Sequence, residues 1–123
     1  MSSTRFRDIE EVLHRLEGRI ADIEGLAVVT KDGLPVAAAL PERIEEDRVG
    51  AMTAAMLSLG ERVVEELERG TIKQVLIEGD NGLVLIIEAG PHAVLAGVCR
   101  PEAKLGLVLL DMRRAAARLA EIV

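Results

Sequence analysis

Residues Ile44–Arg69, IEEDRVGAMTAAMLSLGERVVEELER, form the longest segment of the chain that combines helical periodicity with an absence of proline. At about 1.5 Å per residue, a helix of this length spans roughly 38 Å, the width of a small domain. Apolar side chains recur in it at every third or fourth position and predict one stripe that packs on the core. The members of this stripe are Val49, Met52, Met56, Leu59, Val63 and Leu67.

The rest of this helix is less polar than the surface helix of a monomer should be. The opposite side carries small residues in its first half and becomes acidic in its second half. A side stripe lies between the expected core face and this opposite side, and it consists of Thr53, Leu57 and Val64. We therefore expect the N-terminal half of the helix to be covered by something other than solvent.

Composition limits the classes of function. A chain of 123 residues suits a single domain spanning residues 1–123. The net charge of −6 and a single aromatic residue, Phe6, argue against a nucleic-acid partner, because phosphates need basic residues and single-stranded bases need aromatic rings. No apolar run approaches the ~20 residues of a membrane span, and the N-terminus lacks an apolar leader. A cytoplasmic protein is expected.

Residues that could support catalysis or bind a metal are scattered. No Gly-Lys-Ser/Thr loop is present, and none of the three serines stands in a nucleophile elbow. His14, His92 and Cys99 lack the spacing of a zinc site. Asp80 and Asn81 sit between glycines, where their tolerance of positive φ explains them without calcium. We predict no enzymatic activity, no metal and no cofactor.

The segments around the long helix alternate between helical and extended patterns. Lys31-Asp32-Gly33 joins two extended runs and predicts a hairpin, and Pro35 places the second run at a sheet edge. The strands near the C-terminus are almost continuously apolar, which predicts helices on both faces of the sheet. The expected helices are 5–20, 44–69 and one following Pro101; the expected strands are 26–30, 35–40, 71–78, 83–88 and 93–99. The order is therefore α-β-β-α-β-β-β-α, an α+β fold whose strand order stays open at this point.

This order of elements comes with four characteristic segments. They are the hairpin VVTKDGLPVA (Val28–Ala37), the helical segment AMTAAMLSLGE (Ala51–Glu61), the strand IKQVLIE (Ile72–Glu78) and the segment AKLGLVL (Ala103–Leu109). In these features the chain closely resembles the Roadblock family of dynein light chains and their prokaryotic relatives, over nearly its whole length.

The resemblance implies a profilin-like fold. It comprises a five-stranded antiparallel sheet, order 2-1-5-4-3, between helices 1 and 3 on one face and helix 2 on the other. It also implies a homodimer, in which the third strands of two protomers pair and the second helices lie side by side.

The resemblance also implies a function. Prokaryotic members usually partner a small Ras-like GTPase, and the best-known one, from a gliding-motility system, stimulates GTP hydrolysis. It docks its two-helix platform on the GTPase and orders the catalytic residues of the GTPase without inserting an arginine finger. Eukaryotic members are subunits of dynein or of lysosomal GTPase scaffolds. The resemblance assigns no catalytic residue to this chain.

The residues themselves also favour a dimer. Gly50 and Gly60 inside a helix each cost about 1 kcal/mol relative to alanine, which a close backbone approach would offset. The strand 71–78 would be an exposed edge guarded only by Lys73. A two-fold dimer explains both features; alternatively, the small residues pack under a loop and Lys73 suffices to protect the edge. The predicted dimer interface is Thr53, Leu57, Val64, Ile72, Lys73, Gln74 and Val75.

The remaining strip of the long helix is the predicted partner-binding surface, composed of Arg43, Arg48, Ala54, Ser58 and Arg62. Three functions are therefore considered. The first is a homodimeric regulator of a small GTPase, and the second is a dimeric scaffold that bridges proteins without affecting nucleotide turnover. The third, a small-molecule sensor, is disfavoured because aromatic and convergent polar residues are lacking.

Overall fold

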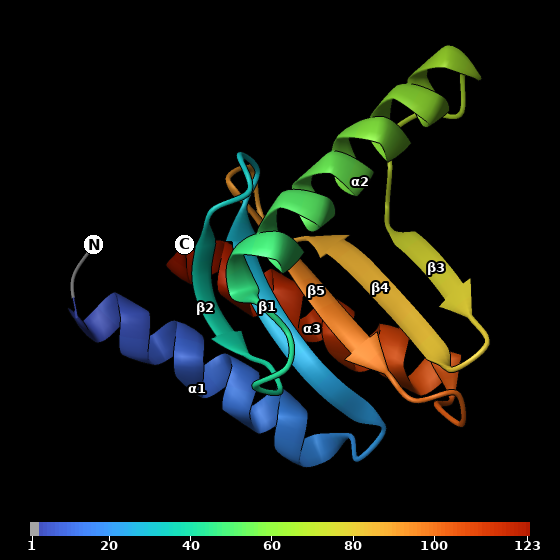
Figure 1. Ribbon diagram of the computed structural model, residues 1–123. Helices are drawn as coiled ribbons and strands as arrows, with labels where there is room; N and C mark the ends of the chain where they lie inside the picture. Colours follow the sequence, from blue (N-terminus) through green and yellow to red (C-terminus); the bar gives the residue numbers. More distant parts are fainter. Residues whose placement is uncertain (1–2) are drawn as a thin grey trace.

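The computed structural model describes residues 3–123, which form three helices and one five-stranded sheet (Figure 1). The type and order of the elements confirm the sequence prediction. The elements are α1 (Ser3–Arg19), β1 (Ile23–Thr30), β2 (Pro35–Ala39), α2 (Glu46–Glu66), β3 (Val75–Gly79), β4 (Gly82–Glu88), β5 (Ala93–Cys99) and α3 (Leu105–Ile122).

The sheet is antiparallel throughout, and its order is β2-β1-β5-β4-β3. Helices α1 and α3 cover one face, and α2 crosses the other face (Figure 1). The predicted strand order and the predicted three layers are confirmed. The first hairpin turns at Gly33, whose φ of 94° is readily available only to glycine.

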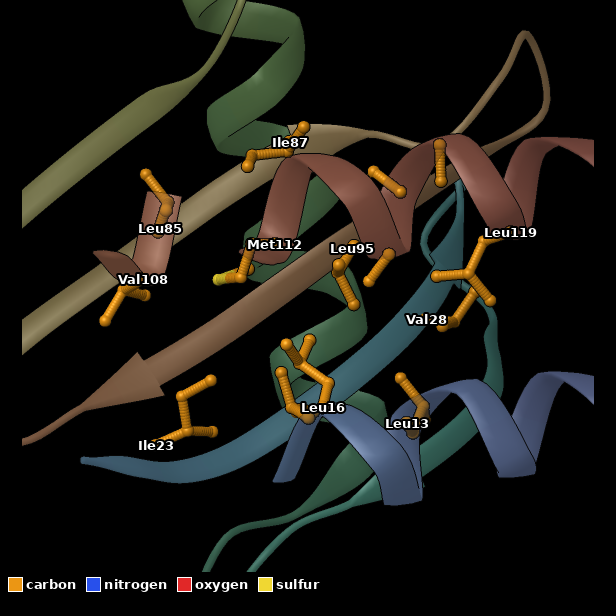
Figure 2. Packing of buried hydrophobic residues seen from close by; sticks show 14 of the residues in the cluster. Leu13, Leu16, Ile23, Val28, Leu85, Ile87, Leu95, Val108, Met112 and Leu119 are labelled. Carbon is orange, nitrogen blue, oxygen red and sulfur yellow. The ribbon is translucent and has the colours of Figure 1, made fainter. Parts of the chain in front are cut away.

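The larger core lies between the sheet and the pair of helices α1 and α3 (Figure 2). Each helix places apolar residues on its sheet-facing side at steps of three or four, and the strands contribute every second residue. The fully buried members that meet here include Ile9 and Leu13 of α1, Val108, Met112 and Leu119 of α3, and Leu26, Val28, Leu85 and Leu95 of the sheet.

A smaller core lies under α2. Leu57 packs there with Ile86 of β4 and with Val94 and Ala96 of β5. Successive residues of a strand point to opposite faces, so Ile86 belongs to this cluster while its neighbour Leu85 belongs to the larger one. The nearly continuous apolar runs of β4 and β5 thus reflect burial on both faces, as predicted.

The face of α2 that rests on the sheet differs from the prediction. The buried residues of α2 are Gly50, Thr53 and Leu57, whereas Leu59 is 56% exposed and Val63 is 47% exposed. The prediction of which stripe of α2 forms the main contact with the sheet was therefore wrong. The predicted stripe consisted of Val49, Met52, Met56, Leu59 and Val63. Thr53 and Leu57, two of the predicted dimer-interface residues, are buried within the protomer at 5% and 2% exposure.

Two glycines account for this orientation of α2. A Cβ on Gly50 would collide with the carbonyl oxygen of Gly33, and a Cβ on Gly60 would lie 2.6 Å from Cδ1 of Ile72. Small residues therefore let α2 approach its own hairpin and the segment before β3. Gly50 packs under the first hairpin of its own protomer, which is the alternative to a close approach between two protomers. Gly60 packs under the side chains of Ile72 and Val75.

Strand β3 is shorter than predicted, because it starts at Val75. The preceding residues Ile72, Lys73 and Gln74 belong to the connection from α2. Ile72 packs against the smaller core, and Oε1 of Gln74 accepts a hydrogen bond of 2.7 Å from Nη2 of Arg113 on α3. The connection is thus held from both faces of the sheet. Among residues 3–123, no helix is long and apolar enough to cross a membrane.

Candidate interaction site

One side of α2 exposes a row of apolar residues, which we call the α2 flank: Met52, Leu59, Val63 and Leu67. Steps of seven and four residues place these side chains on one side of the helix. Their exposed fractions run from 47% to 62%. Met56, between Met52 and Leu59, is half-buried and joins the flank to the smaller core. Large apolar side chains gathered on one exposed face are typical of an interaction surface.

The sheet beside this flank is also incompletely covered. Ile77 of β3 pairs with Val84 of β4, and both lie on the α2 side because Val75, two residues earlier, packs against the smaller core there. Ile77 is 40% exposed. The C-terminal half of α2 meets β3 at its first residue, where a Cβ on Gly60 would lie 3.2 Å from Cγ2 of Val75, and then rises away from the sheet (Figure 1). The α2 flank and β3 therefore border the same open side of the protomer.

Strand β3 is a free edge of the sheet. It pairs with β4 on one side only. Its residues Val75–Gly79 include a single charge, Glu78, and Lys73 lies before the strand instead of within it. An unprotected edge presents unpaired main-chain donors and acceptors, which another strand can satisfy.

The predicted interface residues are distributed unevenly around this open side. Lys73 is exposed, whereas Val64, Ile72, Gln74 and Val75 are half-buried, and Thr53 and Leu57 are buried. Apolar surface at this side is presented by Ile77 of β3 and by four residues that the sequence prediction did not place at the interface, namely Met52, Leu59, Val63 and Leu67. Their signal was visible as an apolar stripe, but it was assigned to the protomer core.

The predicted partner-binding residues fall mostly on one surface. Arg48, Ser58 and Arg62 lie on α2, and Arg43 lies in the segment that leads into it. Ala54 does not join them, because it packs toward the first hairpin, and its Cβ lies 3.6 Å from the position that a Gly33 Cβ would take. The outer surface of α2 therefore carries arginines, a hydroxyl and the carboxylate of Glu66 next to the apolar flank.

Groups that could perform chemistry stay separate. His14 and His92 are exposed, and the described part of the chain contains no group of three or more side chains suited to holding a metal. Cys99 is buried in β5. Burial, followed by the charges of Asp22 and Glu24, raises the pKa of the Cys99 thiol from 9.0 to about 11. A neutral, buried thiol is a poor nucleophile.

Comparison with known proteins places this geometry in a family. Residues 8–98 match the model of the Roadblock/LC7 domain. The chain is also 37% identical, over 107 residues, to the uncharacterized protein MJ1340 of Methanocaldococcus jannaschii, and the match covers 87% of this chain and 90% of the relative.

Solved structures share the fold at lower identity. The gliding protein MglB from Thermus thermophilus superposes with a TM-score of 0.90 at 21% identity, covering 99% of this chain and 93% of that one. A structure described as MglB with a tetrameric arrangement superposes with a TM-score of 0.88 at 21% identity, covering 99% and 92% of the two chains.

Proposed function

The chain belongs to the Roadblock/LC7 domain family, and on that basis we propose that it works as a homodimer that binds a small Ras-like GTPase. It is a non-enzymatic regulator or adaptor, and its effect on the GTPase is to stimulate GTP hydrolysis. The prokaryotic members that its sequence resembles partner such GTPases. The observation that supports the proposal most directly is the exposed α2 flank beside the free edge of β3.

A two-fold dimer covers both features together. The β3 edges of two protomers pair and supply each other with main-chain hydrogen bonds. The α2 helices then lie next to each other, and Leu59, Val63 and Leu67 of one protomer meet the same residues of its partner. Side chains that are exposed in one protomer become buried, at about 25 cal/mol for each Å² of apolar surface removed from water.

The two α2 helices of this dimer present a joint platform to the GTPase. Arg48 and Arg62 lie on the outer side of α2, with Ser58 between them, and Arg43 stands close to its start. These cations are suited to rim contacts that steer an acidic surface of the GTPase into place. The protein contributes no catalytic side chain, so it acts by ordering groups that belong to the GTPase.

Single-turnover GTP hydrolysis tests the proposal. A small Ras-like GTPase encoded in the same genome is loaded with GTP, and hydrolysis is followed with and without this protein. We expect faster hydrolysis with the wild-type protein, and slower hydrolysis when Arg48→Ala and Arg62→Ala are combined. Complex formation without acceleration would favour an adaptor that tethers the GTPase. Neither complex nor acceleration with any such GTPase would contradict the proposal.

A further inference from the structure

A second charged surface lies on the face of the sheet opposite to α2. The groove between α1 and α3 is lined by four arginines, although the chain as a whole carries a net charge of −6. We call this surface the arginine groove; its cations are Arg15, Arg19, Arg114 and Arg118. Exposed guanidinium groups do not stabilise the hydrophobic core, so packing does not explain why four arginines gather here on an acidic protein.

Only Glu11 and Asp111 lie within ion-pair distance of these four arginines among residues 3–123, although Asp8 and Glu121 line one end of the groove. Oδ1 of Asp111 lies 3.7 Å from Nη2 of Arg19 and 3.8 Å from Nη1 of Arg114, so one carboxylate serves two guanidinium groups from different helices. Arg15 pairs with Glu11 at 2.5 Å. Among residues 3–123, Arg118 has no ion-pair partner. The centre of the groove therefore keeps an excess of positive charge, held in place from both helices.

The floor and the ends of the groove give it an amphipathic character. The apolar floor between the arginines is Val12, which is half-buried, and beneath it lie Leu16 and Ala115, which are buried in the core. The groove continues at one end past Asp8 and Glu121, and at the other end past Lys104 and the exposed Leu107. Three adjoining hollows of about 250, 270 and 300 Å³ follow this path. From Asp8 to Arg19 the path measures about 17 Å along α1, or roughly three helical turns.

We propose that the arginine groove binds an acidic amphipathic helix of a partner protein. The apolar side of that helix lies over Val12, and its carboxylates face the arginines on both rims. Guanidinium groups bind carboxylates through paired, directional hydrogen bonds. The site lies on the face opposite to α2, so it is independent of the GTPase function proposed above.

The same features disfavour an anionic membrane as the occupant. A flat lipid surface cannot enter a concave groove, and Asp8 and Glu121 at one end would be repelled by acidic headgroups. The net charge of −6 would oppose adsorption as well. A narrow helix with carboxylates at its centre meets the arginines and avoids these acidic residues.

Peptide binding provides the test. The probe is a synthetic amphipathic helix of about 14 residues, enough for the roughly three turns of the groove. It carries glutamates on one side of its central turns only, so that they lie away from Asp8 and Glu121, and leucines on the other side. A matched peptide has glutamine at every glutamate position. We expect the acidic peptide to bind and the glutamine peptide to bind about tenfold more weakly. Salt at about 1 M, where the Debye length is ~3 Å, should weaken binding of the acidic peptide to the level of its counterpart.

Two double variants with equal charge change locate the binding site. Arg114→Ala with Arg118→Ala should weaken acidic-peptide binding about tenfold, by loss of two ion-pair partners. Arg48→Ala with Arg62→Ala, on α2, should leave peptide binding unchanged. In the GTPase assay the variant with Arg48→Ala and Arg62→Ala should slow hydrolysis, whereas the variant with Arg114→Ala and Arg118→Ala should leave it unchanged. Failure of one proposal is therefore distinguishable from failure of the other.

Several results would overturn the proposal. Equal affinity for the acidic and glutamine peptides would show that charge is not recognised. Unchanged binding by the variant with Arg114→Ala and Arg118→Ala would place the site elsewhere. If vesicles rich in anionic phospholipid bind through these arginines while the acidic peptide does not bind, the groove is a membrane contact. If the groove variant instead changes the oligomeric state and no peptide binds, the occupant is a second copy of this chain.

Discussion

Gly50 of α2 lies directly against the backbone of Gly33 in the turn between β1 and β2, so close that a Cβ on Gly50 would overlap the Gly33 carbonyl oxygen. This contact sets the rotation of α2 on the sheet. It brings Thr53 and Leu57 inward and leaves the α2 flank facing outward. The exposed apolar surface that we assign to a dimer is thus a consequence of two glycines that touch within one protomer.

Replacement of Gly50 should be costly. In Gly50→Ala the new methyl group meets backbone atoms, which cannot rotate away as a side chain can, so α2 must shift. We expect the free energy of unfolding to fall by about 1–3 kcal/mol, measured by urea denaturation. Gly18→Ala in α1 is the control, because nothing lies within 4 Å of its Cβ position. That variant should be more stable by about 0.5–1 kcal/mol. Equal effects of the two changes would contradict the close contact.

The two leucines Leu57 and Leu59 should respond oppositely to a charge. Leu57 is 2% exposed and Leu59 is 56% exposed. Leu57→Glu buries a carboxylate without a partner, so we expect it to abolish cooperative unfolding or to cost about 3 kcal/mol or more. Leu59→Glu should keep a folded protomer, measured by circular dichroism during thermal unfolding. A folded Leu57→Glu variant beside an unfolded Leu59→Glu variant would reverse the assignment of the faces of α2.

The edge strand offers a separate test. Ile77→Lys places a charge on the α2 side of β3, where two protomers are proposed to pair, and a lysine on an edge strand opposes such pairing. We expect the dimer dissociation constant to rise by about tenfold or more, measured by dilution in analytical ultracentrifugation. Leu110→Lys is the matched control, since Leu110 is 46% exposed on α3, on the opposite face of the sheet. Its dissociation constant should not change; equal effects of both changes would contradict pairing at β3.

Cys99 makes stability depend on alkaline pH. Its thiol has a pKa of about 11 in the folded protein against 9.0 ordinarily, chiefly because of burial. The folded form therefore holds the proton more tightly. This contribution to stability is complete below pH 9 and is lost as the pH rises through 9 toward 11, by roughly 2–3 kcal/mol in total.

The measurement compares the free energy of unfolding of wild type and Cys99→Ala across that pH interval. The alanine variant should lose less stability between pH 9 and 11 than wild type. Identical pH dependence in the two proteins would contradict the raised pKa.

The sequence predicted the layers and the neighbours of each strand well, because those depend on patterns that local chemistry produces. Asp32-Gly33 marked the first hairpin, and Pro35 correctly indicated an edge strand. The continuous apolar runs of β4 and β5 correctly indicated helices on both faces. The order of the strands came from the family resemblance, because turn signals determine only which strands are joined along the chain.

The interaction site was harder to predict, because two neighbouring stripes of α2 compete for the sheet. Hydrophobicity favours the stripe that contains Met52, Leu59 and Val63, whereas the observed contact uses Gly50, Thr53 and Leu57. This second stripe faces the sheet because the small residue Gly50 lets the helix axis approach it closely. A hydrophobic pattern measures apolar character only and gives no weight to such a close approach. In the proposed dimer a second protomer covers this exposed apolar stripe. The hydrophobic pattern of one chain does not show whether a stripe is buried within the protomer or against a partner.

The mass of the purified protein in solution shows whether two protomers associate through the α2 flank. Sedimentation at micromolar concentration should give twice the 13.2 kDa of one chain for the wild type, and the mass of a single folded chain for Leu59→Glu. This pair of results would show that the α2 flank joins two protomers. A wild-type protein that sediments as a 13.2 kDa monomer at that concentration would contradict the proposed dimer.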